Sequence, residues 1–242
     1  MRFWIFFQQL APALAAGFFQ QVVHVVLHGA FRDEQRLGDL TVGAAVQHQT
    51  QYLPLPGGEV VVCSTKDGEL CVNGMSNRKR DSGTANSGIL CDVRPEDFGS
   101  DDVLAGVRFQ QKYERLAFIN GGGDFTAPSC SMEAFLSRSP GSEKVTGSLP
   151  VFAAEAIREA VPDFARKIHG YDDPSAVVTA VETRSSSPVR IVRDEYGESN
   201  IKGVYPAGEG AGYAGGITSA ACDGIRAAWH IIERYRPLQQ DL

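Results

Sequence analysis

The stretch Asn200-Ile-Lys-Gly-Val-Tyr-Pro-Ala-Gly-Glu-Gly-Ala-Gly-Tyr-Ala-Gly-Gly-Ile-Thr-Ser-Ala220 carries the strongest structural signal in the chain. Its apolar start predicts a short strand over 201–205, and apolar residues at helical spacing predict a helix over 218–234. Five glycines lie within the nine residues 208–216. A strand–loop–helix unit of this kind directs unpaired backbone N–H groups and the positive end of a helix toward one point. The stretch therefore predicts a binding site for an anion or a polarised carbonyl.

Residues 210–215 match the pattern G-x-G-x-x-G, which is weak evidence when it stands alone. Only 27 residues follow Gly215, too few for the second strand and ribose-binding acid of a complete mononucleotide unit. We therefore expect the loop to close a site that earlier parts of the fold build. The alternative is a helix start packed tightly on a sheet, which would need one or two glycines rather than five.

Composition argues against several classes of function. A net charge of −6 argues against a general nucleic-acid binder, and the one dense basic stretch, residues 78–80, is followed at once by Asp81. The five cysteines are odd in number and widely spaced, so neither a metal site nor a disulfide framework is predicted. No run of about 18 apolar residues occurs, and the first residues make a poor signal peptide. We expect a soluble cytoplasmic protein that does not bind membranes.

Local patterns predict the other elements. A turn at 66–69 joins two strands of a hairpin, and Pro162 is expected to break a long helix into two pieces. The predicted strands span 59–63, 70–72, 89–93, 176–183 and 189–193, the predicted helices span 102–120 and 151–168, and residues 137–147 are a predicted loop.

Residues 1–56 differ in character from the rest. They are rich in Gln and His, and their apolar residues follow neither the helical nor the strand period over more than a few positions. A dinucleotide-binding fold would open with a strand, a glycine-rich turn and a helix, and that pattern is absent here. We expect this segment to be a divergent addition, or sequence from another reading frame, that stands apart from the remainder.

Three strings resemble those of a bacterial family of FAD-dependent dehydrogenases, or NAD(P)/FAD-dependent oxidoreductases, that is largely uncharacterised. The strings are Val72-Asn-Gly-Met-Ser76, Thr183-Arg-Ser-Ser-Ser-Pro-Val-Arg190 and Tyr205-Pro-Ala-Gly-Glu-Gly-Ala-Gly-Tyr-Ala-Gly-Gly216. The resemblance covers the chain from about residue 56 to the end of the last helix. It implies the C-terminal domain of such a protein, with a cap over about 57–180 and an FAD-binding closing segment over about 181–236. The implied fold class is α/β, with α+β character in the cap: a partial FAD/NAD(P)-binding flavoprotein fold that lacks the N-terminal Rossmann unit.

The resemblance also implies a cofactor site. FAD is the cofactor, NAD(P)H is a candidate electron donor, and the carboxylate of Glu209 accepts a hydrogen bond from a ribityl hydroxyl. A Gly212→Val substitution is expected to abolish flavin binding while leaving the chain folded. The implied cofactor-binding residues are Gly208, Glu209, Gly210, Ala211, Gly212, Gly215, Gly216, Ile217 and Thr218.

Two arginines of the second string are candidates for the chemistry. Arg184, and after it Arg190, could stabilise negative charge on a reduced flavin or bind a substrate carboxylate by a two-pronged contact. We expect Arg184 on the same side of the molecule as the glycine-rich loop, because two neighbouring strands would each precede one of these segments. The alternative is a surface turn whose arginines form ion pairs with Asp194 or Glu182.

Two functions from different classes follow. The first is an FAD-dependent oxidoreductase that acts on a small molecule, in an incomplete copy. The second is a non-catalytic remnant or interaction protein that keeps the fold without binding flavin.

Overall fold

The computed structural model describes residues 2–10, 58–64, 66–76, 84–168 and 170–235. Contacts divide the chain into two compact units. We call residues 2–93 and 111–183 the sheet unit, and residues 94–110 and 184–242 the loop–helix unit.

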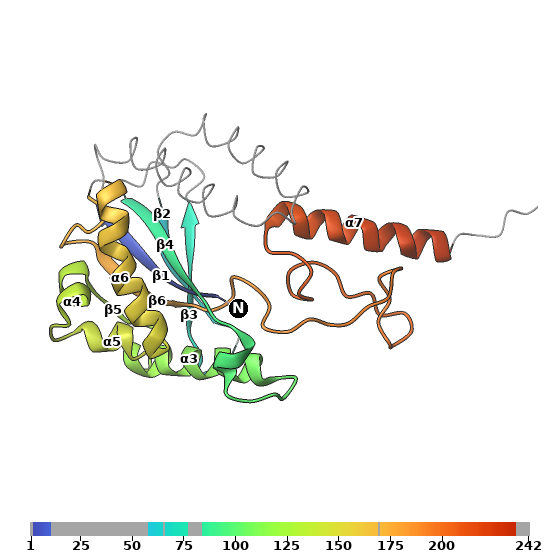
Figure 1. Cartoon of the computed structure of the whole chain (residues 1–242), viewed down its shortest axis with the longest axis horizontal. Coiled ribbons are helices and arrows are strands. Elements are labelled where there is room, and N and C mark those ends of the chain that lie inside the picture. Colours follow the sequence, from blue (N-terminus) through green and yellow to red (C-terminus); the bar gives the residue numbers. More distant parts are fainter. Residues whose placement is uncertain (1, 11–57, 65, 77–83, 169, 236–242) are drawn as a thin grey trace, which may run out of the picture. The chain divides into compact units, whose positions relative to one another are not determined.

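The sheet unit is built on a four-stranded antiparallel sheet in the order β4-β1-β6-β5 (Figure 1). Strand β1 (Arg2–Leu10) lies inside it and pairs with β4 (Thr84–Asp92) on one side and β6 (Val177–Glu182) on the other. The short β5 (Ser129–Ser131) pairs with the far edge of β6. Antiparallel strands combined with helices make the described fold a mixed α/β structure of the α+β kind.

The predicted hairpin is confirmed. Strands β2 (Gly58–Cys63) and β3 (Cys71–Ser76) pair antiparallel as a separate two-stranded sheet. The hairpin contacts β4 through β2 and β6 through β3, so it packs across the larger sheet. The family-like string of residues 72–76 is therefore part of a strand, and its Val72 is buried.

The longer helices agree with the predictions except at Pro162. Helix α6 runs unbroken through this proline, which costs the helix one backbone hydrogen bond. Burial of Ile157 and Val161 on the same helix offsets that cost, so the expected break is wrong. The helices are η1 (Pro95–Phe98), α3 (Ala105–Gly121), α4 (Met132–Ser137), α5 (Ser142–Thr146), α6 (Val151–Lys167) and α7 (Ile217–Arg234).

The expectation that the N-terminal segment stands apart is wrong for residues 2–10. They form β1 at the interior of the sheet, and Ile5 is fully buried. The partners of β1 lie about 80 and 170 residues further along the chain, so a local sequence pattern cannot predict this strand pairing. Residues 11–57 lie outside the described part of the chain, and the proposed origin of residues 1–56 stays a prediction.

The core of the sheet unit combines apolar packing with one buried polar contact. Its largest buried side chains include Phe135, Met132 and Leu70. Among them, the fully buried hydroxyl of Thr183 donates to Oε1 of Glu114 at 2.5 Å, while the backbone N–H of Leu70 donates to the carbonyl of Glu114 at 3.0 Å. These contacts connect α3 to the end of β6 and to the hairpin, so Thr183 has a structural role.

Within the described residues, every helix is too short or too polar to cross a membrane.

Candidate functional site

The glycine-rich loop of residues 208–216 lies in the loop–helix unit, immediately before α7. The strands predicted at 189–193 and 201–205 are wrong: among the described residues this region forms turns, bends, irregular chain and a single bridge between Arg193 and Ser199. Side-chain hydrogen bonds explain the difference. The hydroxyl of Ser187 donates to the carbonyl of Val189, and the N–H of Ile201 donates to the hydroxyl of Ser199. Such local bonds stabilise turns in place of strand pairing.

Two backbone hydrogen bonds fold the loop on itself. The N–H of Gly212 donates to the carbonyl of Glu209 at 2.9 Å, and the N–H of Tyr213 donates to the carbonyl of Gly208 at 3.0 Å. Gly208 and Gly212 have φ values of 74° and 82°. This left-handed conformation strains any residue with a side chain, so the turn itself requires glycine at both positions.

Residues just before the loop support it. The N–H of Ile191 donates to the carbonyl of Ala211 at 3.2 Å, and Nε of Arg190 donates to the carbonyl of Gly212 at 3.0 Å. A Cβ atom placed on Gly212 would lie only 2.6 Å from the carbonyl oxygen of Val189. Gly212 therefore serves packing, and a valine side chain at this position would strain the turn. That Gly212→Val leaves the chain folded and abolishes flavin binding stays a prediction.

The glycines at 210 and 215 differ from Gly208 and Gly212. Neither has a positive φ, and a Cβ atom on either would meet no atom of the described chain within 4 Å. Both residues are exposed. Neither conformation nor packing within the described residues requires glycine at these two positions, and their backbone is open to close approach from outside.

The start of α7 adjoins this open backbone. Gly216 is the N-cap residue, has extended backbone and provides no side-chain cap, and the following Ile217 and Thr218 are exposed. The first N–H groups of a helix lack intrahelical partners, and the helix dipole places partial positive charge there. This end of α7 can therefore accept an anion or a polarised carbonyl oxygen.

An ion pair between Arg193 and Asp223 attaches the loop to α7. The guanidinium donates to both carboxylate oxygens, with Nη1–Oδ2 at 2.9 Å and Nη2–Oδ1 at 2.6 Å. Asp223 also accepts from the N–H of Gly208 at 2.8 Å, and Arg193 also donates to the carbonyl of Pro206 at 2.8 Å. The guanidinium also lies over the ring of Tyr213, with Cζ of Arg193 3.6 Å from the ring centroid.

Electrostatics strengthen this attachment. The hydrogen bonds from Arg193, and secondarily the N–H of Gly208, lower the pKa of Asp223 below its usual value. The same carboxylate raises the pKa of Arg193. Both side chains are largely buried, with 9% of the Asp223 side chain and 17% of the Arg193 side chain exposed, so solvent screens the ion pair only weakly. The pair positions the first turn of the loop on the helix.

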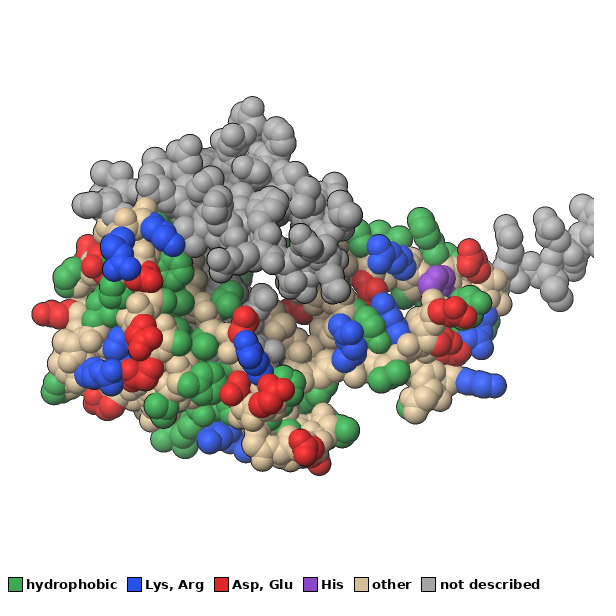
Figure 2. All heavy atoms as spheres, in the orientation of Figure 1, with side chains coloured by type: hydrophobic (Ala, Val, Ile, Leu, Met, Phe, Trp, Pro, Cys, Tyr) green, Lys and Arg blue, Asp and Glu red, His purple; other side chains and the backbone are tan. Residues whose placement is uncertain are grey.

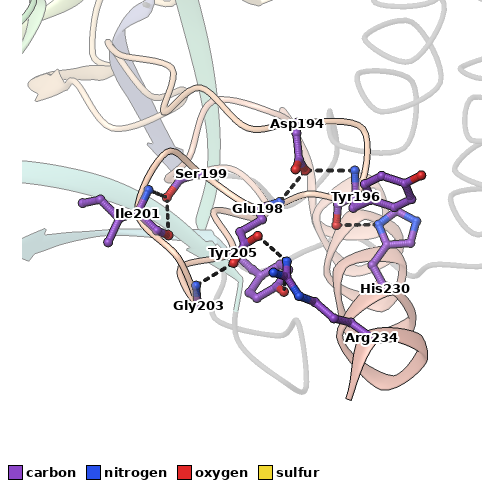
Figure 3. A network of polar contacts seen from close by, with 9 residues as sticks. All are labelled: Asp194, Tyr196, Glu198, Ser199, Ile201, Gly203, Tyr205, His230 and Arg234. Atoms are coloured by element: carbon purple, nitrogen blue, oxygen red, sulfur yellow. Dashed lines mark hydrogen bonds and ion pairs between the residues drawn. The ribbon is translucent and has the colours of Figure 1, made fainter. Parts of the chain in front are cut away.

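A second polar network connects the segment before the loop to the C-terminal half of α7 (Figure 3). Oε1 of the buried Glu198 accepts from the N–H of Gly203 at 2.7 Å, and its other carboxylate oxygen forms an ion pair with Arg234. Nδ1 of His230 donates to the carbonyl of Tyr196 at 2.7 Å. The Gly203 hydrogen bond, followed by Arg234, lowers the pKa of Glu198. The irregular segment is thus attached to α7 in both halves of the helix, at Asp223 and at His230 and Arg234.

The structure brings part of the predicted site together. Glu209 is half-buried, and its carboxylate makes no hydrogen bond or ion pair with the rest of the described chain. Arg190 contacts the loop through Gly212, and its guanidinium lies 4.9 Å from the ring centroid of Tyr213. Arg184 is exposed. The two strands that were to place Arg184 beside the loop are not both formed, so its nearness to the loop stays a prediction.

Sequence reasoning missed Arg193 and Asp223, which organise the loop. A usable signal was the position of Asp223, a lone acid within an otherwise neutral helical turn of α7. The described residues contain no group of three or more His, Cys, Asp or Glu side chains that could bind a metal ion.

Comparison with known proteins agrees with the resemblance. A Clostridium beijerinckii protein described as uncharacterized is 43% identical over an alignment of 196 residues, and the match covers 74% of this chain and 37% of that protein. The chain thus spans little more than a third of the length of this relative. A family model described as "FAD-dependent protein, C-terminal domain-like" matches residues 54–185, more than half of the chain. The chain therefore belongs to the family of FAD-dependent protein C-terminal domains.

Proposed function

We propose that the loop–helix unit binds the flavin end of FAD, and that the protein functions as an FAD-dependent oxidoreductase that acts on a small molecule. The observation that carries this proposal is the open backbone at Gly210 and Gly215, beside the uncapped start of α7. The family match ends at residue 185, so the role of the loop rests on this geometry together with family membership.

The chain's own groups suit a flavin. The first N–H groups of α7, at residues 216–218, would oppose a carbonyl oxygen of the flavin or a phosphate. The carboxylate of Glu209 would accept a hydrogen bond from a ribityl hydroxyl. Arg190 and Arg184 would stabilise negative charge on a reduced ring or bind a substrate carboxylate. FAD, when bound, supplies the hydride or electron chemistry.

We assign the flavin end of FAD, rather than the adenosine end, to this chain. A dinucleotide-binding unit has parallel strands, the first of which leads through a glycine-rich turn into a helix. In the described residues all paired strands are antiparallel, and the glycine-rich loop follows irregular chain. This arrangement fits a partial flavoprotein fold.

Spectroscopy of the purified full chain tests the proposal. Incubation with FAD followed by desalting is expected to leave protein with the yellow absorption band of oxidised flavin. Anaerobic addition of NADH or NADPH, the candidate donors, would bleach this band. Protein that stays colourless at every FAD concentration would contradict the proposal.

A second candidate is a non-catalytic interaction protein, favoured by one observation on α7. Ile225, Trp229 and Ile232 recur at helical spacing on this helix and are each more than half exposed. Figure 2 shows hydrophobic side chains standing out from the surface over α7. Colourless protein that forms a stable complex through this face would support this candidate instead.

A further inference from the structure

Cys63 and Cys71 face each other across the hairpin at its turn end. They are register partners in the β2–β3 ladder, although seven residues separate them in the chain. Their sulfur atoms lie 3.4 Å apart, and Sγ of Cys71 also lies 3.2 Å from the carbonyl oxygen of Cys63. Neither cysteine forms a disulfide in the structure.

The backbone at this pair already suits a disulfide. Directly opposed residues of antiparallel strands have Cα atoms about 4.5 to 5.5 Å apart. Disulfides join cysteines whose Cα atoms are about 4.4 to 6.8 Å apart. The two sulfur atoms would need to approach by only about 1.4 Å to reach bonding distance, which small side-chain rotations supply. No strand has to move.

We propose that Cys63 and Cys71 form a redox-active dithiol that closes reversibly to a disulfide, with a low-molecular-weight disulfide such as oxidised glutathione as the oxidant. The two thiols differ in access: Cys63 is exposed, and only 1% of the surface of Cys71 is exposed. Cys63 is therefore the attacking thiol and Cys71 the resolving thiol.

The reaction balances in two exchange steps. The thiolate of Cys63 attacks one sulfur of glutathione disulfide, the S–S bond breaks, and one glutathione leaves as thiolate. The thiolate of Cys71 then attacks the sulfur of Cys63, the mixed disulfide breaks, and the second glutathione leaves. The protein loses two electrons and two protons, and the oxidant becomes two molecules of glutathione.

Two of the three remaining cysteines provide controls. Burial raises the pKa of the Cys130 thiol to about 11, which keeps it protonated and unreactive near neutral pH. Cys222 is exposed on α7 and lies in the loop–helix unit, whereas the hairpin lies in the sheet unit. Cys222 can take up glutathione but belongs to the other unit from the hairpin pair. The inference is independent of flavin binding.

The test uses the full chain, reduced, freed of reductant and incubated with glutathione disulfide. Remaining thiols are alkylated and the peptides are mapped by mass spectrometry. We expect Cys63 and Cys71 of the wild type to lose alkylation together and to retain no glutathione. Treatment with dithiothreitol should restore alkylation at both cysteines. Cys71→Ser should retain glutathione on Cys63, whereas Cys222→Ser should behave at the hairpin as the wild type does.

Two results would overturn the inference. One is wild-type protein in which Cys63 and Cys71 both stay alkylatable after oxidant treatment. The other is wild-type protein that keeps glutathione on Cys63, because that would show Cys71 unable to resolve the mixed disulfide. If Cys71→Ser, whose position is buried, fails to fold, the exposed Cys63→Ser variant decides: it should leave Cys71 alkylatable under the oxidant that closes the wild-type pair.

Discussion

Arg193 and Asp223, 30 residues apart in the chain, form a two-pronged ion pair with N–O distances of 2.9 and 2.6 Å. Because Asp223 also accepts from the N–H of Gly208 and Arg193 also donates to the carbonyl of Pro206, this pair connects α7 to the start of the glycine-rich loop. The loop conformation therefore depends on a helix residue that lies after it in the sequence.

Removal of Asp223 should loosen the loop and α7 together. Asp223→Ala leaves Arg193 and the N–H of Gly208 without their acceptor, a loss of about 2 to 3 kcal/mol. Hydrogen exchange of the α7 amides should then accelerate by at least about tenfold. Asp163→Ala is the matched control, because it breaks an exposed ion pair with Arg166 on α6 and should change exchange in α7 very little. Equal protection of α7 in the two variants would contradict the role of Asp223.

Acid should weaken the same attachment. The pKa values of Asp223 and Glu198 are both lowered in the folded protein. Their contribution to stability is thus fully present above the unfolded carboxyl pKa, about 4, and is lost as the pH falls through the lower folded values. Unfolding followed from pH 7 to pH 2 should show this loss below about pH 4. An Asp223→Asn, Glu198→Gln double variant should show a flatter profile, and an unchanged slope would argue against both carboxylates.

The two left-handed glycines should respond differently to alanine. Gly208→Ala adds backbone strain, but its new Cβ would lie 3.7 Å from the nearest atom, the Cβ of Ala220. Gly212→Ala adds similar strain and also places a Cβ 2.6 Å from the carbonyl of Val189. We expect Gly212→Ala to lower the free energy of unfolding by about 1 kcal/mol more than Gly208→Ala. Denaturant titrations measure this difference, and a larger effect at position 208 would contradict the described packing.

Local patterns predicted those elements whose signals are local. The hairpin, α3 and α7 follow from periodicity, turn residues and caps within single short segments. Strand β1 could not be predicted, because its partners β4 and β6 are distant in the sequence and its polar Gln8 and Gln9 interrupt the apolar run.

The place of the glycine-rich loop before α7 could be predicted, whereas the residues that support the loop could not. Ligand binding by the loop stays a prediction. Clustered glycines before a helix indicate a ligand loop from sequence alone. The irregular path of residues 187–205 depends on side-chain hydrogen bonds such as those of Ser187 and Ser199. The apolar pattern of this segment indicates strands and does not reveal these bonds. Arg193 and Asp223 meet only in three dimensions, and the contact of Cys63 with Cys71 required the hairpin register.

Titration of the full chain with FAD, followed by flavin fluorescence, tests the central claim most directly. The wild type should bind saturably, and Gly215→Val, whose side chain enters space left empty by the described chain, should bind at least tenfold more weakly, about 1.4 kcal/mol. Gly224→Ala, which also meets open space but lies within α7, should bind as the wild type does. Equal FAD affinity for the wild type, Gly215→Val and Gly224→Ala, or no binding by any of them, would contradict the assignment of the glycine-rich loop to the flavin.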